Sequence, residues 1–231
     1  MRKTVLFVVT STADLGSTGA KTGAWLEELA APYAVFEDAG FQSLIASTAG
    51  GAAPLDPASL EKPWITPKGE RFLTDPQARA KMDGSHPVGS ITAAEVDAVF
   101  VVGGTGTMWD FPHSAELGNL LTDVHALGKP VAAVCHGVVA LLTAKDAGGN
   151  PLAAGRRLTC FSNAEESLLE FDKIVPLLAE TALRDQGANY SAAEPFAEHV
   201  VRDGLVLTGQ NPASAAPLAE AVVQFLLEQD R

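Results

Sequence analysis

The stretch that decides the fold of this chain is Val131-Ala132-Ala133-Val134-Cys135-His136-Gly137-Val138-Val139. Its first four residues are small and apolar and predict a buried strand, and the apolar run after Gly137 predicts a helix that follows almost without a loop. Cys135 is therefore expected on a sharp strand-to-helix turn, the geometry of a nucleophile elbow. Free backbone N–H groups and the helix dipole at such a turn are expected to lower the pKa of its thiol and to stabilise an oxyanion.

The alternative for Cys135 is an ordinary core residue, because free cysteine is among the most buried residue types. Its place at the carboxyl end of a predicted central strand favours a functional role, since open α/β sheets bind ligands at that edge. A nucleophilic thiol is therefore the working hypothesis.

The sequence on either side of this turn alternates between strand and helix patterns. Apolar, β-branched runs predict strands at residues 4–10, 41–46, 98–102 and 131–134, and a hairpin is expected from 199–201 and 205–208. Helical patterns lie at residues 23–39, 115–127, 137–145, 176–186 and 213–229. This order predicts an α/β fold, a flavodoxin-like three-layer sandwich with a mostly parallel central sheet.

Residues 47–92 interrupt this alternation. Six of the fourteen prolines lie between Pro54 and Pro87, and no strand pattern appears among them. An insertion of this length is typical of a lid or a partner surface, and the alternative is a surface segment without a role in chemistry. Because no linker or repeat divides the rest, we expect residues 1–231 to form a single domain.

Composition restricts the possible partners and sites. The 231 residues carry a net charge of −12, which disfavours nucleic acid and anionic membranes. The apolar run from Val5 to Val9 is too short for a signal or membrane segment, so a cytoplasmic protein is expected. Two cysteines and five scattered histidines show no metal-ligand spacing. No metal and no disulfide are therefore expected.

A glycine-rich loop is expected at the same sheet edge as Cys135. The strand that ends at Val102 is followed by Gly103-Gly104-Thr105-Gly106, whose backbone amides are expected to face the cysteine. The loop has neither the Lys-Ser/Thr pair of a P-loop nor the third glycine of a dinucleotide fingerprint. A plain tight turn is the alternative for this motif taken alone.

A carboxyl group is also expected near the thiol. Trp25, Leu29, Tyr33 and Phe36 form an apolar stripe at helical spacing that is expected to face the sheet. Glu28 borders this stripe and points toward the strand ends, where burial beside a thiolate would raise its pKa and fit it for proton transfer. The alternative is a solvated helix glutamate.

Taken together, these motifs resemble the ThiJ/PfpI superfamily, which is class I glutamine amidotransferase-like, and within it the heat-shock chaperone and glyoxalase III branch. The matching segments are residues 19–28 with Pro32, 103–110, 132–137 and 208–214. The resemblance implies that Cys135 is the nucleophile, His136 the adjacent histidine and Glu28 the carboxylic acid partner.

The resemblance also implies the acid that orients His136 and the oxyanion loop. The acid is expected between Asn163 and Glu166, with Glu166 as the best match and Glu165 as the reserve. The loop is matched by Gly104, Thr105 and Gly106. Two positions depart from the family pattern: Thr105 stands where many relatives have a histidine, and Cys160, which we expect in the core, stands where a glycine is usual.

The function implied is a cofactor-free, glutathione-independent glyoxalase III reaction on small 2-oxoaldehydes, methylglyoxal to lactate, in a homodimer. A cysteine hydrolase or deglycase that acts on amide or glycation adducts is one alternative. A stress chaperone or redox sensor, in which Cys135 is oxidised, is another. Glutaminase chemistry is disfavoured, because residues 209–214 contain no histidine where such enzymes place theirs.

Overall fold

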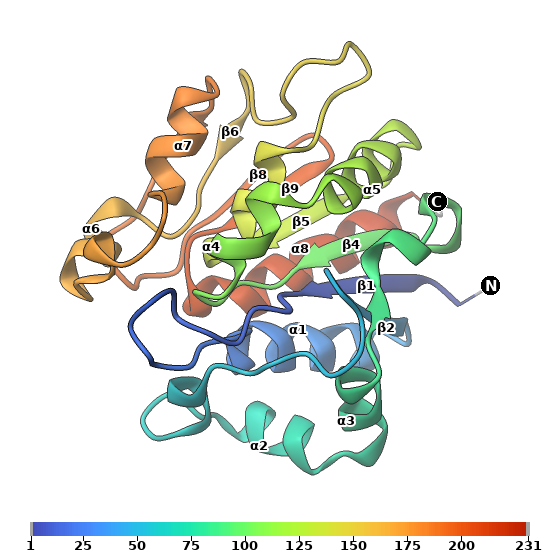
Figure 1. Cartoon of the computed structure of the whole chain (residues 1–231). Helices are drawn as coiled ribbons and strands as arrows, with labels where there is room; N and C mark the ends of the chain where they lie inside the picture. Colours follow the sequence, from blue (N-terminus) through green and yellow to red (C-terminus); the bar gives the residue numbers. More distant parts are fainter. Residues whose placement is uncertain (1, 230–231) are drawn as a thin grey trace.

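The centre of the molecule is a seven-stranded sheet with the strand order β3-β2-β1-β4-β5-β9-β8 (Figure 1). The computed structural model describes residues 2–229. All neighbouring strands pair in parallel except β8 and β9, which form the expected antiparallel hairpin. The strands are β1 Thr4–Val9, β2 Gln42–Ser47, β3 His86–Pro87, β4 Ala98–Val101, β5 Val131–Val134, β8 Val200–Asp203 and β9 Val206–Gly209. The order β2-β1-β4-β5-β9 is that of a flavodoxin-like sheet, as predicted.

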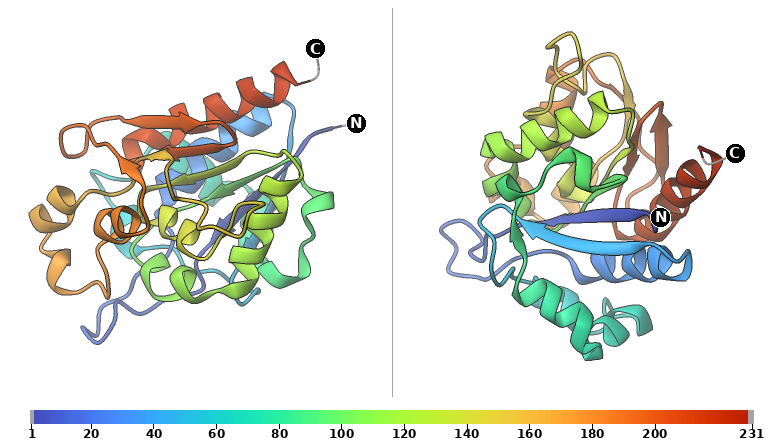
Figure 2. Two further views of the ribbon diagram at one scale, coloured as in Figure 1. Left: turned by 90° about the horizontal axis from the view of Figure 1, so that it is seen from above. Right: turned by 90° about the vertical axis from the view of Figure 1, so that its right-hand side faces the viewer.

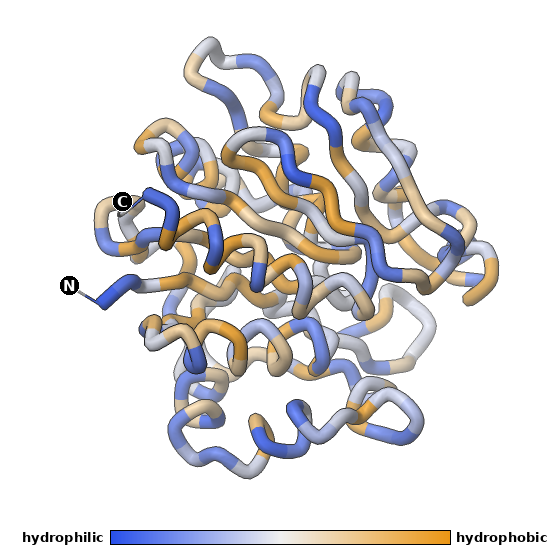
Figure 3. Tube along the Cα trace, turned by 180° about the vertical axis from the view of Figure 1, so that it is seen from behind, coloured by the Kyte–Doolittle hydropathy of each residue, from blue (hydrophilic) through white to orange (hydrophobic). Residues whose placement is uncertain are grey.

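Helices cover both faces of this sheet. The right-hand view of Figure 2 separates α1 (Leu26–Asp38) and α8 (Ala215–Glu228) on one face from α5 (Ala115–Ala126) on the other. The first face has a core rich in aromatic rings, and the second is mainly aliphatic. Figure 3 shows the hydrophobic residues concentrated in the strands, with hydrophilic ones along the outer loops. Burial of apolar surface on both faces is the main force that holds the layers together.

The segment after Cys135 differs from its prediction. It is a 3-10 helix over Cys135–Leu142, not an α-helix, and it ends before residue 145. The β-branched Val138 and Val139 are poor α-helix formers. A Cβ atom at Gly137 would lie 2.7 Å from the carbonyl oxygen of Val102, so the segment also packs directly under the neighbouring strand. Close packing against β4 therefore replaces the regular helix that the apolar pattern indicates.

The remaining elements connect the strands of the sheet and the helices that cover it. A short parallel pair, β6 (Arg157–Leu158) with β7 (Asn189–Tyr190), was not predicted, and the helix expected at 176–186 begins only at Ala179. The remaining helices are α4 Thr107–Asp110, α6 Asn163–Leu168, α7 Ala179–Asp185 and the 3-10 turns η3 Ala93–Glu95, η4 Phe111–His113, η6 Phe171–Lys173 and η7 Pro212–Ser214. No helix among residues 2–229 combines the length and apolar character that a membrane crossing requires.

The insertion at residues 47–92 is more regular than its prolines suggest. It contains α2 (Pro67–Thr74), α3 (Pro76–Asp83), the 3-10 turns η1 (Pro57–Leu60) and η2 (Val88–Ser90), and the edge strand β3. The prolines begin these helices, and Thr66 and Asp75 accept hydrogen bonds from the next free amides. Proline is well suited to the first turn of a helix, where it loses no hydrogen bond. Because β3 lies within residues 47–92, the expectation that this segment contains no strand was wrong.

The insertion is attached to the start of α1. The Ala24 amide donates to the Pro54 carbonyl over 2.9 Å, and the Asp56 amide donates back to Ala24, also over 2.9 Å. A Cβ atom at Gly23 would lie 2.5 Å from the Pro54 oxygen, so this contact requires glycine. Beyond it, α2 and α3 lie on the outer side of α1 (Figure 1). The insertion is thus fixed beside the first turn of α1.

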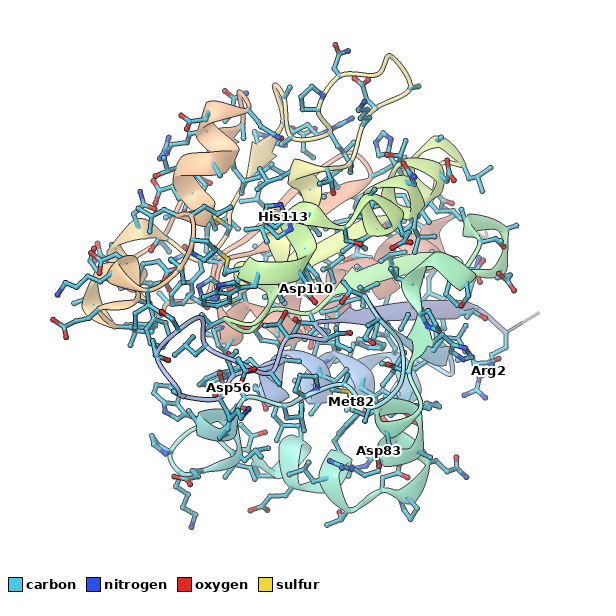
Figure 4. All side chains as sticks on the ribbon, viewed as in Figure 1. Arg2, Asp56, Met82, Asp83, Asp110 and His113 are labelled. Atoms are coloured by element: carbon cyan, nitrogen blue, oxygen red, sulfur yellow. The ribbon has the colours of Figure 1, made fainter. Side chains whose placement is uncertain are left out.

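Two acidic residues labelled in Figure 4 tie loops together near the strand ends. Asp110 accepts hydrogen bonds from the Thr10 hydroxyl, the Ser11 amide and the Thr48 hydroxyl, which joins the ends of β1 and β2 to α4. Asp56 accepts from the hydroxyl of Thr22 over 3.0 Å. These bonds fix the loops that surround the carboxyl edge of the sheet.

Candidate active site

Cys135 occupies a strained turn directly after β5. Its φ is 58°, in the left-handed region that residues other than glycine rarely adopt. Such a conformation costs on the order of 1–3 kcal/mol and persists where the surrounding structure requires it. The side chain is only 4% exposed. The expected sharp strand-to-helix turn is therefore present, with the thiol at the carboxyl end of a central strand.

The expected lowering of the Cys135 pKa is not found. Burial raises the pKa of the thiol well above its usual range, and the nearby Glu28 carboxyl raises it further. A hydrogen bond from the His136 amide acts in the opposite direction but does not outweigh burial. The raised pKa favours the thiol over the thiolate, so a nucleophilic role for Cys135 would require a base that takes its proton.

Glu28 lies in the first turn of α1 and is fully buried. A Cβ atom at Gly103 would lie 2.4 Å from its Oε2 and 2.8 Å from the Cβ of Cys135, so all three groups meet at one point. Neither carboxyl oxygen has a hydrogen bond of normal geometry, although the Cys135 thiol and the Gly103 amide lie near it. Burial raises the pKa of Glu28 to about 8, the direction that the sequence predicts.

His136 is held between the thiol and a second buried carboxylate. Its Nδ1 lies 3.4 Å from Cys135 Sγ, and its Nε2 lies 2.7 Å from Glu166 Oε1. With the proton on Nε2 donated to Glu166, the lone pair of Nδ1 faces the thiol. The Phe161 ring lies 4.4 Å from the imidazole, centroid to centroid. Glu166 is therefore the residue that contacts His136, as the first choice from the sequence has it.

Glu165 points away from His136 and serves a different purpose. Its carboxylate accepts hydrogen bonds from three separate segments: Ser162 at the start of α6, the amide of Phe196, and the side chains of Gln210 and Asn211. Ser162 and Glu165 form a capping box, a motif readable from the sequence as Ser-x-x-Glu. The Ser-x-x-Glu pattern thus identifies Glu165 as the residue that caps the helix and distinguishes it from the neighbouring Glu166.

The thiol opens into a cavity of about 300 Å³. Gly104 and Thr105 of the predicted oxyanion loop line it, and so do Glu28 and Asn211. Among the described residues, no protein acceptor is found for the amides of Gly104 and Thr105, which leaves them free for a ligand. Gly106 does not line the cavity. It packs instead against the loop after β1, where a Cβ atom on Gly106 would lie 2.8 Å from the Thr12 oxygen. The predicted loop is thus only partly at the cavity.

The aromatic lining of the cavity was missed by the sequence analysis. Trp25 was expected to pack on the sheet with Leu29, Tyr33 and Phe36; the other three are buried there, but Trp25 is only partly buried and lines the cavity. Trp64, from the insertion, lies 5.8 Å from it between ring centroids. The other large apolar lining residues are Phe161, Leu169, Phe171 and Phe196. They come from three separate segments, so no local pattern groups them.

The second cysteine is in the core, as expected. Cys160 is fully buried, and its Sγ donates to the carbonyl oxygen of Phe161 over 3.3 Å. Burial raises the pKa of its thiol well above the usual range, and both cysteines are free thiols. Within residues 2–229, no three His, Cys, Asp or Glu side chains are grouped so as to hold a metal ion.

Comparison with known proteins places these features in a wider group. Residues 20–225 match the DJ-1/PfpI family. The glutathione-independent glyoxalase HSP31 of Saccharomyces cerevisiae is 31% identical, over 97% of this chain and 98% of its own. The crystal structure of glyoxalase III from Candida albicans has a TM-score of 0.86 at 27% identity, with 96% of each chain covered. The 24 kDa rapid encystment protein of Francisella tularensis has a TM-score of 0.93 at 37% identity, with 97% of this chain and 99% of that chain covered.

Proposed function

The chain belongs to the DJ-1/PfpI family, and on this basis we propose that it is a glutathione-independent, cofactor-free glyoxalase that converts small 2-oxoaldehydes such as methylglyoxal to 2-hydroxy acids such as lactate. The observation that carries the proposal is the meeting of the Cys135 thiol, the Glu28 carboxyl and the His136–Glu166 pair at one cavity. Similarity to the yeast glutathione-independent glyoxalase and to glyoxalase 3 of Candida albicans supports the same reaction.

In the first step, Cys135 adds to the aldehyde carbon. His136 Nδ1 takes the thiol proton, and Glu166 stabilises the imidazolium that forms. The sulfur–carbon bond forms while the carbonyl π electrons move to oxygen, where the free amides of Gly104 and Thr105 stabilise the charge. The oxygen then takes the proton from His136, which gives a neutral hemithioacetal.

In the second step, hydrogen moves between the two substrate carbons. The Glu28 carboxylate removes the proton from the carbon bonded to sulfur, which gives an enediolate, and returns it to the neighbouring carbon, while the hydroxyl proton of the hemithioacetal moves to the oxygen of that neighbouring carbon. The first carbon is oxidised to a thioester and the second is reduced to an alcohol, so no external electron acceptor is needed. A pKa of about 8 makes Glu28 a stronger base than an ordinary glutamate.

In the last step, water attacks the thioester carbonyl. The carbon–sulfur bond breaks, the thiolate regains a proton, and the 2-hydroxy acid leaves. His136 is placed to accept a proton from the water and to return it to sulfur, since its Nδ1 faces Sγ. Overall, one molecule of 2-oxoaldehyde and one molecule of water give one molecule of 2-hydroxy acid.

The test is lactate formation from methylglyoxal without glutathione, compared among the wild type, Cys135→Ala, Glu28→Gln and the control Cys160→Ala. We expect lactate from the wild type and the control, a loss of at least about a thousandfold for Cys135→Ala, and at least about a hundredfold for Glu28→Gln. Full activity of Cys135→Ala would refute the proposal.

The finer properties of the protein are part of the same proposal. We propose a homodimer, as the family resemblance implies, a cytoplasmic location, since the Val5–Val9 run is too short for a signal segment, and a single domain over residues 1–231. Light scattering on the purified chain would test the dimer, with the mass of one chain as the contrary result. A chaperone activity of the same protein would be recognised by suppression of aggregation that persists in Cys135→Ala.

A further inference from the structure

The cavity is large for the smallest 2-oxoaldehydes. Its volume is about 300 Å³, whereas a water molecule takes about 30 Å³ of the liquid. Methylglyoxal, which carries a single methyl group beside its two carbonyls, leaves most of this space empty. Pockets of about 300 Å³ and above usually hold ligands of drug size. The volume therefore accommodates a substrate with a much larger substituent.

The two ends of the cavity differ in chemistry. Cys135 is 4% exposed and Glu28 is fully buried, so the reacting groups lie at the inner end. Trp64, Leu169 and Phe196 also line the cavity and are 51%, 44% and 43% exposed, so they form its mouth. A substrate must enter with its two carbonyl groups first, which leaves its substituent among the side chains at the mouth.

The side chains at the mouth are suited to an aromatic ring. Trp25 and Trp64 meet at 71° with centroids 5.8 Å apart, and Phe161 and Phe196 meet at 54° with centroids 6.2 Å apart. Pairs at such angles present both faces and edges to a further ring, which is the arrangement that aromatic groups prefer. The described lining residues include no lysine or arginine. An uncharged aryl group is therefore favoured over an anionic one.

We propose that the preferred substrates of this protein are aryl-substituted 2-oxoaldehydes of the phenylglyoxal type, and that Trp64 and Phe196 determine this specificity. The inference rests on the proposed glyoxalase function and names its substrate class. The reaction is that of the small substrates: phenylglyoxal and one water give mandelate, with the aldehyde carbon oxidised and the ketone carbon reduced. The insertion contributes to specificity through Trp64.

The kinetic test compares kcat/KM for phenylglyoxal and methylglyoxal, with mandelate and lactate measured by chromatography. We expect the wild type to prefer phenylglyoxal by about tenfold or more, in line with the effect of a larger apolar group in a matching pocket. Trp64→Ala and Phe196→Ala should each lower this ratio about tenfold. The control is Leu60→Ala, since Leu60 lies in the same insertion, is 37% exposed and does not line the cavity. It should leave the ratio unchanged.

A binding test separates the specificity from the reaction. Calorimetry with 2-hydroxyacetophenone and hydroxyacetone, which lack the aldehyde, should show at least tenfold tighter binding of the aryl compound, reduced by Trp64→Ala. Equal affinities, or equal kcat/KM values for the two aldehydes, would overturn the aryl preference even in an active glyoxalase. Tight aryl binding without any hydroxy acid would instead overturn the proposed function and leave the aryl site standing.

Discussion

Glu28 is a fully buried carboxyl group without a cationic neighbour among the groups that shift its pKa. Burial raises its pKa from 4.5 to about 8. Between pH 4.5 and about pH 8, the Glu28 carboxyl is therefore protonated in the folded protein and ionised in the unfolded chain. The free energy of unfolding contributed by this group therefore falls as pH rises from about 4.5 to 8.

Replacement of Glu28 by glutamine should stabilise the fold while it removes the proposed base. At pH 7 the raised pKa corresponds to about 3 kcal/mol of lost stability. We expect Glu28→Gln to unfold at a higher urea concentration, with a gain that grows between pH 5 and pH 8. Glu70→Gln, at an exposed position, is the control and should show no such trend. A variant less stable than the wild type at pH 8 would contradict the assignment.

The adjacent Glu165 and Glu166 should respond differently to the same substitution. Glu165→Gln places an NH2 group against donors from Ser162, Gln210 and Asn211, so we expect a loss of about 3 kcal/mol of stability. Glu166→Gln still accepts the His136 proton but no longer stabilises an imidazolium. We therefore expect near-normal stability with kcat lowered about tenfold or more. The reverse pattern, measured by urea unfolding and lactate formation, would exchange the two roles.

The sequence could predict which residues meet but not the state of the thiol. Local patterns place Cys135 at a strand end and Glu28 on a helix, and the family resemblance adds His136 and Glu166. The raised thiol pKa depends on burial and on a carboxyl group more than a hundred residues away in the chain, which a local motif does not contain. The prediction that the start of a helix lowers the pKa of the Cys135 thiol was wrong in direction. Complete burial raises this pKa more than the single hydrogen bond from the His136 amide lowers it.

Among the elements, the loop after β4 sets the distance between acid and thiol. A Cβ atom at Gly103 would lie 2.4 Å from Glu28 Oε2 and 2.7 Å from the Val134 oxygen. We expect Gly103→Ala to displace the carboxyl group, with a loss of activity of about a hundredfold and reduced stability. Gly84→Ala, where the nearest atom is 3.3 Å away, is the matched control. Wild-type kcat in Gly103→Ala would show that the position of Glu28 is not critical.

The insertion contains two helices, α2 and α3, that were not predicted from the sequence. No helix was predicted at Pro67 or Pro76, although each proline follows a capping residue and begins a helix. The dipeptides Thr-Pro and Asp-Pro are local signals for the start of a helix. By contrast, the contact of Gly23 with Pro54, which places Trp64 at the cavity mouth, joins separate segments and has no signature within either one. The strands β1, β2, β4, β5, β8 and β9 could be predicted because each carries its own apolar run, whereas the two-residue β3 at His86–Pro87 carries none.

At the scale of the whole molecule, helices α2 and α3 of the insertion share buried contacts with one face of the sheet. The core on the α1 side joins residues from β1, α1, the insertion and α8, among them Phe7, Leu29, Phe72 and Val222. We therefore expect one cooperative unfolding transition, with far-UV circular dichroism and tryptophan fluorescence coincident in urea. Of the three tryptophans only Trp64 lies in the insertion, so an earlier fluorescence transition that disappears in Trp64→Phe would show that this segment unfolds separately.

The cavity has one further consequence, which concerns the departure of the product. In the proposed reaction a neutral aldehyde enters, and a carboxylate forms at a wall to which residues 2–229 contribute no lysine or arginine. The protein also carries a net charge of −12, so the newly formed anion is repelled by its surroundings. Hydroxy acids should consequently be weak inhibitors, and the enzyme should continue to work in a cell that accumulates them.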